Sequence, residues 1–86
     1  MQVLELKNLT REEGYIYYRR NFNGIAVLEL PSKTVDVEIN FIIEMLPTGR
    51  KDLELEFVDS FEYPLLPVKN AVTQYIMKLE DEGLLP

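Results

Sequence analysis

Apolar and polar residues alternate over the longest regular stretch of this chain, residues 35–45. The odd positions are all apolar, and four of the five even positions are polar. Side chains on a β-strand alternate between its faces, so the pattern predicts a strand with one apolar face. That face consists of Val35, Val37, Ile39, Phe41, Ile43 and Met45. Turn residues at 47–51 interrupt the alternation, which resumes at 53–57, and together the two stretches predict a β-hairpin.

Shorter stretches before this hairpin predict more strands. Residues 2–7 predict an edge strand, and residues 9–14 predict a loop or a single turn. Residues 15–22 are aromatic and prone to form a strand. The pair Asn23-Gly24 is typical of a type I′ hairpin turn, because both residue types tolerate a positive φ. Residues 25–30 then return as the next strand.

The last predicted element is a helix over residues 68–82. Its apolar stripe consists of Val68, Val72, Tyr75, Ile76 and Leu79, and its wetter side includes Lys69, Thr73 and Glu80. Gly83 suits the position after a helix end, where Leu84 folds back in a Schellman motif. The acidic residues 80–82 oppose the helix dipole, so we expect this end to fray. The two prolines within residues 60–67 argue against a regular strand or helix there.

These elements predict one small α+β domain over residues 1–86. The fold class is an antiparallel β-meander of four to five strands with one C-terminal helix packed on one face, in the order β-β-β-β-β-α. A chain of 86 residues is too short for two cores. Hydrophobic residues make up 47% of it and charged residues 28%, a composition typical of a globular protein.

The predicted hairpins also assign residues to the two sheet faces. Ala26, Leu28 and Leu30 join the helix-covered face if Leu30 pairs with Val35. The apolar part of the opposite face then consists of Ile16, Tyr18, Arg20, Phe22, Ile25, Val27, Ile42 and Val58. So large an apolar zone needs a cover. The candidates are the 61–67 segment, the N-terminal strand and a second copy of the chain, of which we favour the second copy.

The other part of that face is acidic. It carries Asp36, Glu38, Glu44, Glu54 and Glu56, and either plausible register places Glu44 opposite Glu54 or Asp52. A basic partner surface would relieve this repulsion, and a solvated face is the alternative. Glutamates on a strand diverge, so they suit a metal ion poorly and we expect none.

Most catalytic chemistry lacks its residues. The chain has no cysteine and no histidine, and the common nucleotide-binding, hydrolase and metal motifs are absent. We therefore expect no enzymatic activity, no cofactor and no metal. The chain shows no signal peptide and no membrane-spanning run, which favours a cytoplasmic protein.

The net charge of −6 is unevenly distributed. Residues 1–34 hold five cations against four carboxylates, whereas residues 35–86 hold four cations against eleven carboxylates. Such a field repels phosphate chains, so it disfavours nucleic acid and anionic membranes without excluding single strands.

One cluster has the chemistry of single-strand recognition, in which bases stack on aromatic rings and arginines contact the backbone. It consists of Tyr15, Tyr17, Tyr18, Arg19, Arg20 and Phe22. Together with residues 25–30, the 47–51 turn and the terminal helix, this stretch resembles the single-stranded-DNA-binding domain of the positive cofactor 4 family of transcriptional coactivators. That resemblance covers about a third of the chain and implies a curved antiparallel sheet, a helix and a dimer. The chain departs from the family in an extra strand pair, the 61–67 segment and its acidity.

Three hypotheses for function follow. The first is a non-enzymatic protein-interaction or homo-oligomerising module, with a homodimer or protein partner bound through Tyr18, Phe22, Ile25 and Val27. The second is a single-stranded nucleic-acid-binding sheet that uses the Tyr/Arg stretch 15–22. The third is a small acidic inhibitor or mimic that presents Glu38, Glu44, Glu54 and Glu56 to a basic site.

Overall fold

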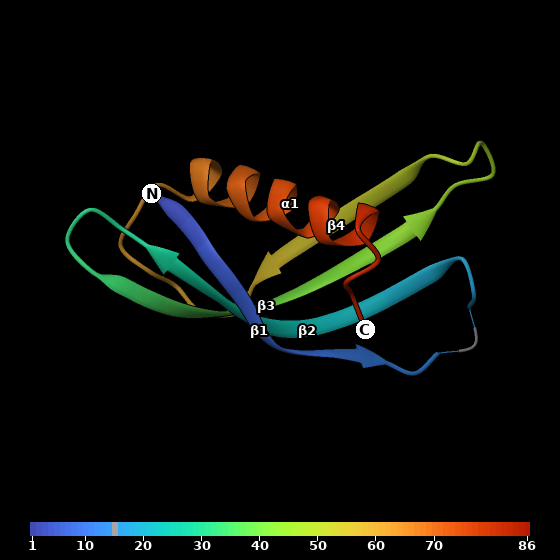
Figure 1. Ribbon diagram of the computed structural model, residues 1–86, viewed down its shortest axis with the longest axis horizontal. Coiled ribbons are helices and arrows are strands. Elements are labelled where there is room, and N and C mark those ends of the chain that lie inside the picture. The colour runs from blue at the N-terminus through green and yellow to red at the C-terminus, as the bar shows by residue number, and fades with distance from the viewer. Residues whose placement is uncertain (15) are drawn as a thin grey trace.

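The computed structural model describes residues 1–14 and 16–86 as an antiparallel sheet and one helix (Figure 1). The elements are β1 (Gln2–Glu12), β2 (Arg19–Glu29), β3 (Thr34–Met45), β4 (Lys51–Phe57) and α1 (Leu65–Asp81). Each strand pairs with the next along the chain, in the order β1-β2-β3-β4. The predicted α+β class, the antiparallel meander and the C-terminal helix are confirmed. In the described part of the chain, no helix is long and apolar enough to cross a membrane.

The predicted turn at Asn23-Gly24 is wrong, because both residues lie inside β2. Gly24 pairs with Ile39 of β3, and Leu9 of β1 packs over it. A Cβ atom on Gly24 would lie 2.5 Å from the Leu9 Cδ2 atom. The glycine therefore allows a close approach between strands, and the sheet has four strands instead of five.

Strand β1 is longer than predicted, because it continues past Lys7 to Glu12. The expected loop over residues 9–14 is wrong for most of its length. The pairing of β1 with β2 shifts twice, between Val3 and Glu5 and between Lys7 and Thr10. Asn8, in the second irregularity, has a φ of 54°. Bulges of this kind change the phase of the apolar pattern, so a regular alternation does not reveal the strand.

The core lies between α1 and one face of the sheet. Its buried residues are Phe22, Ala26, Leu28, Leu30, Val37, Ile39, Phe41, Ile43, Leu55, Val68, Val72 and Ile76. The predicted apolar faces of β3 and α1 are thus confirmed. Phe22 lies opposite Phe41, and the two rings stack with centroids 4.8 Å apart. The expectation that Phe22 and Arg20 lie on the opposite face is wrong, because β2 runs on without the predicted turn.

Helix α1 begins three positions earlier than predicted, at Leu65. Pro67 falls in its first turn, where a backbone N–H has no intrahelical acceptor, so the proline is tolerated. At the other end, Gly83 adopts a φ of 69°. The Leu84 N–H donates to the Leu79 carbonyl at 2.9 Å, which confirms the predicted Schellman motif.

The last turn of α1 is tied to the sheet by Glu80. Its carboxylate pairs with the guanidinium of Arg20 and lies 3.0 Å from the Lys51 Nζ atom. The Glu80 side chain is only 7% exposed, so its predicted place on the wetter side is wrong. The hydrogen bond from Arg20, assisted by Lys51, lowers the pKa of Glu80 despite its burial. These contacts hold the helix end that the charge pattern predicted to fray.

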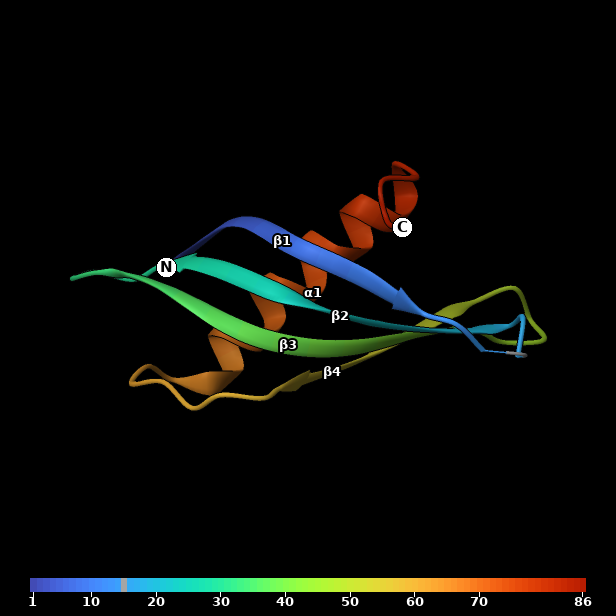
Figure 2. The same cartoon turned by 90° about the horizontal axis from the view of Figure 1, so that it is seen from below.

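The sheet face opposite α1 is not covered by any other described segment of the chain (Figure 2). The Phe61 ring packs edge-on against Phe57, which shares the helix-covered face with Ile39. Strand β1 joins the sheet at its edge instead of crossing it. Neither candidate cover from within the chain therefore occupies this face.

Candidate functional site

The uncovered side of the sheet, here called the open face, is defined by the strand register. Directly paired residues of antiparallel strands share a face. Ile25 pairs with Glu38, and Ile42 pairs with Glu54, so these side chains lie together away from α1. Among the described residues, this face is the largest surface that the chain leaves without a second layer.

Carboxylates dominate the open face. Nine belong to it: Glu5, Glu12, Glu29, Asp36, Glu38, Glu44, Asp52, Glu54 and Glu56. Lys7 and Arg19 are the two cations at its register positions. The predicted acidic residues Glu38, Glu44, Glu54 and Glu56 are all included, whereas sequence reasoning missed Glu5, Glu12, Glu29 and Asp52 as members of the same surface.

The two cations lie beside carboxylates. Lys7 is 2.8 Å from the Asp36 carboxylate, and the hydrogen bond between them raises the pKa of Lys7. Arg19 pairs in register with Glu44, whose other neighbour is Asp52. The register thus settles which residue opposes Glu44, and most carboxylates of the open face remain without a cation opposite them.

The middle of the open face is apolar. Ile25 and Val27 of β2 and Ile42 of β3 are each half-buried there. Ile25 and Val27 pair directly with Glu38 and Asp36. The predicted apolar zone therefore exists in part, with carboxylates around it, but without Phe22 and Arg20.

Two asparagines of β2 differ sharply in their surroundings on this face. The Asn23 Nδ2 atom donates to Glu38 Oε2 at 3.1 Å, to the Ile39 carbonyl at 3.3 Å and to Asn40 Oδ1 at 2.6 Å. The Asn21 Oδ1 atom is buried and accepts no hydrogen bond from the described residues. Asn21 pairs with Ile42, so this carbonyl oxygen lies next to the apolar middle.

The predicted Tyr/Arg cluster is divided among several surfaces. Tyr17 is 92% exposed and Tyr18 is 47% exposed, and their rings meet edge-on with centroids 5.7 Å apart. Arg19 belongs to the open face, whereas Arg20 and Phe22 face α1. Tyr15 lies outside the described residues. This arrangement leaves few of the cluster's members able to stack a base or contact a phosphate together.

A second surface lies where the β1–β2 and β3–β4 connections meet. The Met45 N–H donates to the Tyr18 carbonyl at 2.7 Å, which joins the two hairpins. A shallow apolar groove there is lined by Tyr17, Tyr18, Glu44, Met45, Leu46 and Pro47. Sequence reasoning identified its tyrosines but not the residues contributed by β3 and its loop.

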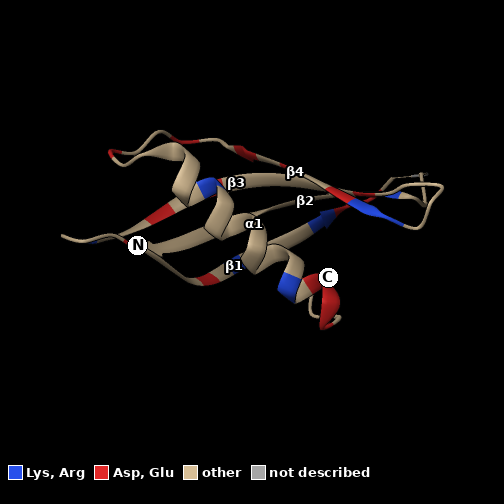
Figure 3. Ribbon diagram, turned by 90° about the horizontal axis from the view of Figure 1, so that it is seen from above, with Lys and Arg blue, Asp and Glu red and all other residues tan. Residues whose placement is uncertain are grey.

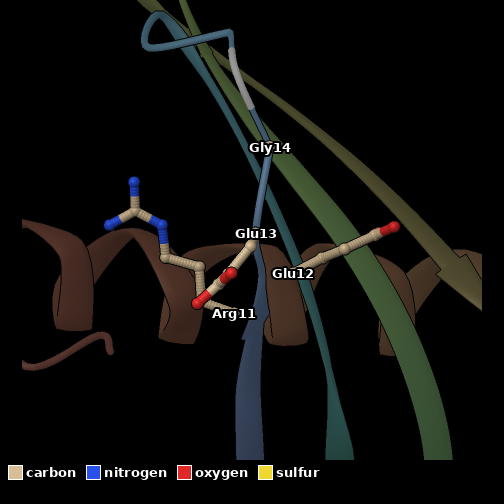
Figure 4. A pocket seen from close by; sticks show the side chains of 4 residues that line it. All are labelled: Arg11, Glu12, Glu13 and Gly14. Carbon is tan, nitrogen blue, oxygen red and sulfur yellow. The ribbon is translucent and has the colours of Figure 1, made fainter.

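The hollow at the end of β1 offers no catalytic arrangement. It is lined by Arg11, Glu12, Glu13 and Gly14. Figure 4 shows the Glu12 side chain pointing away from those of Arg11 and Glu13, so the acidic groups do not converge on one point. General acid–base catalysis needs such convergence on a substrate. Over residues 1–14 and 16–86, no group of three or more candidate ligand side chains could hold a metal ion.

Comparison with known proteins identifies a family whose description states no activity. No curated protein and no solved structure matches the chain. One family model matches residues 1–81, which is most of the chain. The protein with this acidic open face is therefore a member of the BB_0187 family.

Proposed function

We propose that this protein is a non-enzymatic binding module whose open face takes a basic surface of another protein. The observation that carries the proposal is the charge of that face. Nine carboxylates and two cations share it, and no described segment of the chain covers it. The proposal joins the protein-interaction hypothesis to that of an acidic mimic.

The layout of the open face matches that of a protein interface. Interfaces of this kind have an apolar centre that loses its water and a polar rim that stays partly solvated. Ile25, Val27 and Ile42 supply such a centre, and the carboxylates supply the rim. A rim of one charge accelerates encounter with a partner of opposite charge and rejects partners of like charge.

A second copy of the chain fits this face poorly. In a twofold dimer the same patch meets itself, so carboxylates would oppose carboxylates. The homodimer favoured by the sequence would have to use another surface, such as the groove at Tyr17, Tyr18 and Pro47. Nucleic acid is repelled for the same electrostatic reason. The proposal therefore names a basic protein as the partner, in the cytoplasm and with neither cofactor nor metal.

Charge reversal on and off the open face tests the proposal. The test variant is Glu38→Lys/Glu54→Lys, and the control is Glu62→Lys/Glu82→Lys, which changes net charge equally at exposed sites outside this face. Each tagged protein is used to capture partners from nuclease-treated and untreated lysate of the native cell. We expect basic proteins on the wild type and on the control, and their loss on the test variant.

Two outcomes would contradict this function. Equal capture by the test variant and the control would remove the open face from binding. Partners that disappear only after nuclease treatment would instead support the single-strand hypothesis. Circular dichroism of both variants checks that each retains its fold.

A further inference from the structure

We propose that the free edge of β4 takes a partner strand of alternating basic and apolar residues as a fifth strand of the sheet. This inference rests on the proposed function, because it specifies the form in which a basic partner binds. It is carried by the backbone of β4, by the two rows of side chains on that strand and by the contrast with the other edge.

Strand β4 has a strand neighbour on one side only. It pairs with β3 from Lys51 to Phe57, and no strand lies beyond it among the described residues. Figure 3 shows β4 along one border of the sheet and β1 along the other. Every second backbone N–H and C=O of an edge strand points outward, away from its neighbour. These groups can pair with an added strand, as in recognition by β-augmentation.

The two edges of the sheet differ in how well they resist such pairing. β1 is interrupted by two irregularities, and Asn8 within it has a φ of 54°. Bulges break the row of outward-pointing groups and protect an edge. β4 pairs with β3 without any shift in register, and it contains no proline. The β4 edge is therefore the continuous one.

The side chains of β4 specify what would pair with it. Asp52, Glu54 and Glu56 are exposed on the open face, while Leu53, Leu55 and Phe57 face α1. Directly opposed side chains on neighbouring strands interact, favourably for opposite charges and for apolar pairs. A fifth strand would thus carry lysine or arginine at every second position and apolar residues between them. Its apolar side chains would cover Leu53 and Phe57, which are only half-buried.

A second copy of the chain is a poor occupant. Antiparallel pairing of two β4 edges around a twofold axis keeps the open faces of both copies on the same side. The acidic row would then oppose itself, and like charges directly opposed are destabilising. The occupant that fits is a foreign strand of basic character.

A peptide titration of the full chain tests the inference. The probe is a capped seven-residue peptide of alternating lysine and valine, which matches the seven residues of β4. The control peptide has the same composition with its lysines and valines in two blocks. We expect the alternating peptide to bind at least about tenfold more tightly, because only it can place both rows correctly. Hydrogen exchange should slow at alternate amides of residues 51–57, and not along β1.

N-methylation locates the backbone contacts. In an added strand, the amides that face β4 belong to every second residue. One peptide is methylated on its valine nitrogens and another on its lysine nitrogens, and we expect one of the two to lose binding and the other to keep it. In the protein, Glu54→Lys/Glu56→Lys should weaken binding of the unmethylated peptide, and Glu62→Lys/Glu82→Lys should not.

The outcomes separate this inference from the proposed function. Equal binding of the alternating and block peptides, or unchanged exchange in β4, would overturn strand addition and leave the acidic face as a binding surface. No binding of either peptide would also overturn strand addition. Strand addition that is seen while Glu38→Lys/Glu54→Lys captures the same lysate partners as its control would instead overturn the proposed function.

Discussion

Arg20 of β2 donates two hydrogen bonds to the carboxylate of Glu80, which lies 60 positions later in the last turn of α1. Lys51 of β4 reaches the same carboxylate. One side chain thus joins the end of the helix to two strands that do not neighbour each other in the sheet. The contact also places a carboxylate at the negative end of the helix dipole, where it needs compensating cations.

Replacing Glu80 should release that end of the helix. Glu80→Gln removes the charge and keeps most of the shape, so we expect a loss of about 1.5–3 kcal/mol in the free energy of unfolding, as for hydrogen bonds to charged groups. Urea denaturation measures it. Asp81→Asn is the matched control, because Asp81 is exposed in the same turn and should change stability by less than about 0.5 kcal/mol. Equal effects of the two substitutions would mean that helix-dipole charge alone matters.

The same pair predicts how stability depends on pH. Arg20 and Lys51 lower the pKa of Glu80 in the folded protein. The folded state therefore binds this proton less readily than the unfolded state does. The stabilisation is fully present above the ordinary glutamate value of 4.5, and is lost as the pH falls from there through the folded pKa. Unfolding curves between neutral pH and acid should converge for wild type and Glu80→Gln, and a constant gap between them would contradict the prediction.

Gly24 should tolerate no side chain while Leu9 is present. We expect Gly24→Ala to cost about 1–3 kcal/mol, because its Cβ atom overlaps the Leu9 side chain. In a Leu9→Ala background the same change should cost less than about 0.5 kcal/mol, which a double-mutant cycle of unfolding free energies measures. Gly14→Ala is the control, because a Cβ atom there meets nothing within 4 Å. An unchanged cost in the Leu9→Ala background would point to a backbone requirement instead.

Asn21 and Asn23 should respond in opposite directions to the same substitution. Asn21→Val removes a buried oxygen without a hydrogen-bond donor and places a β-branched side chain beside Ile42, so we expect a gain of about 0.5–1 kcal/mol. Asn23→Val removes a donor to three acceptors and should cost about 1 kcal/mol. Thermal melts distinguish the two. Shifts of equal sign would show that β propensity, and not hydrogen bonding, decides the outcome.

The parts of the fold that could be predicted depend on local periodicity. Val37, Ile39 and Phe41 alternate with polar residues, and Val68, Val72 and Ile76 recur at helical spacing, so each pattern identifies its own buried face. The Gly83 helix end follows from residue type in the same way.

The parts that could not be predicted depend on contacts between distant segments. Asn23-Gly24 has the composition of a turn, but the packing of Leu9 from another strand determines its conformation. Glu80 opposes the helix dipole locally, and its partners come from two other strands. The carboxylates of β3 and β4 could be assigned to one face, whereas Glu5 and Glu12 depend on a bulged register. Asn8, a residue type that tolerates positive φ, was the one local signal of that bulge.

The meander also determines the order in which the chain can fold. Closing a loop costs less entropy the shorter the loop is, and the connections on both sides of β3 span only residues 30–33 and 46–50. The two hairpins that share β3 should therefore form first, with β1 adding afterwards. The Arg20–Glu80 contact closes the longest of these separations and belongs to the last step. Until then Phe41 and Ile43 face water, so the interval before the helix docks is when this chain is most prone to aggregate.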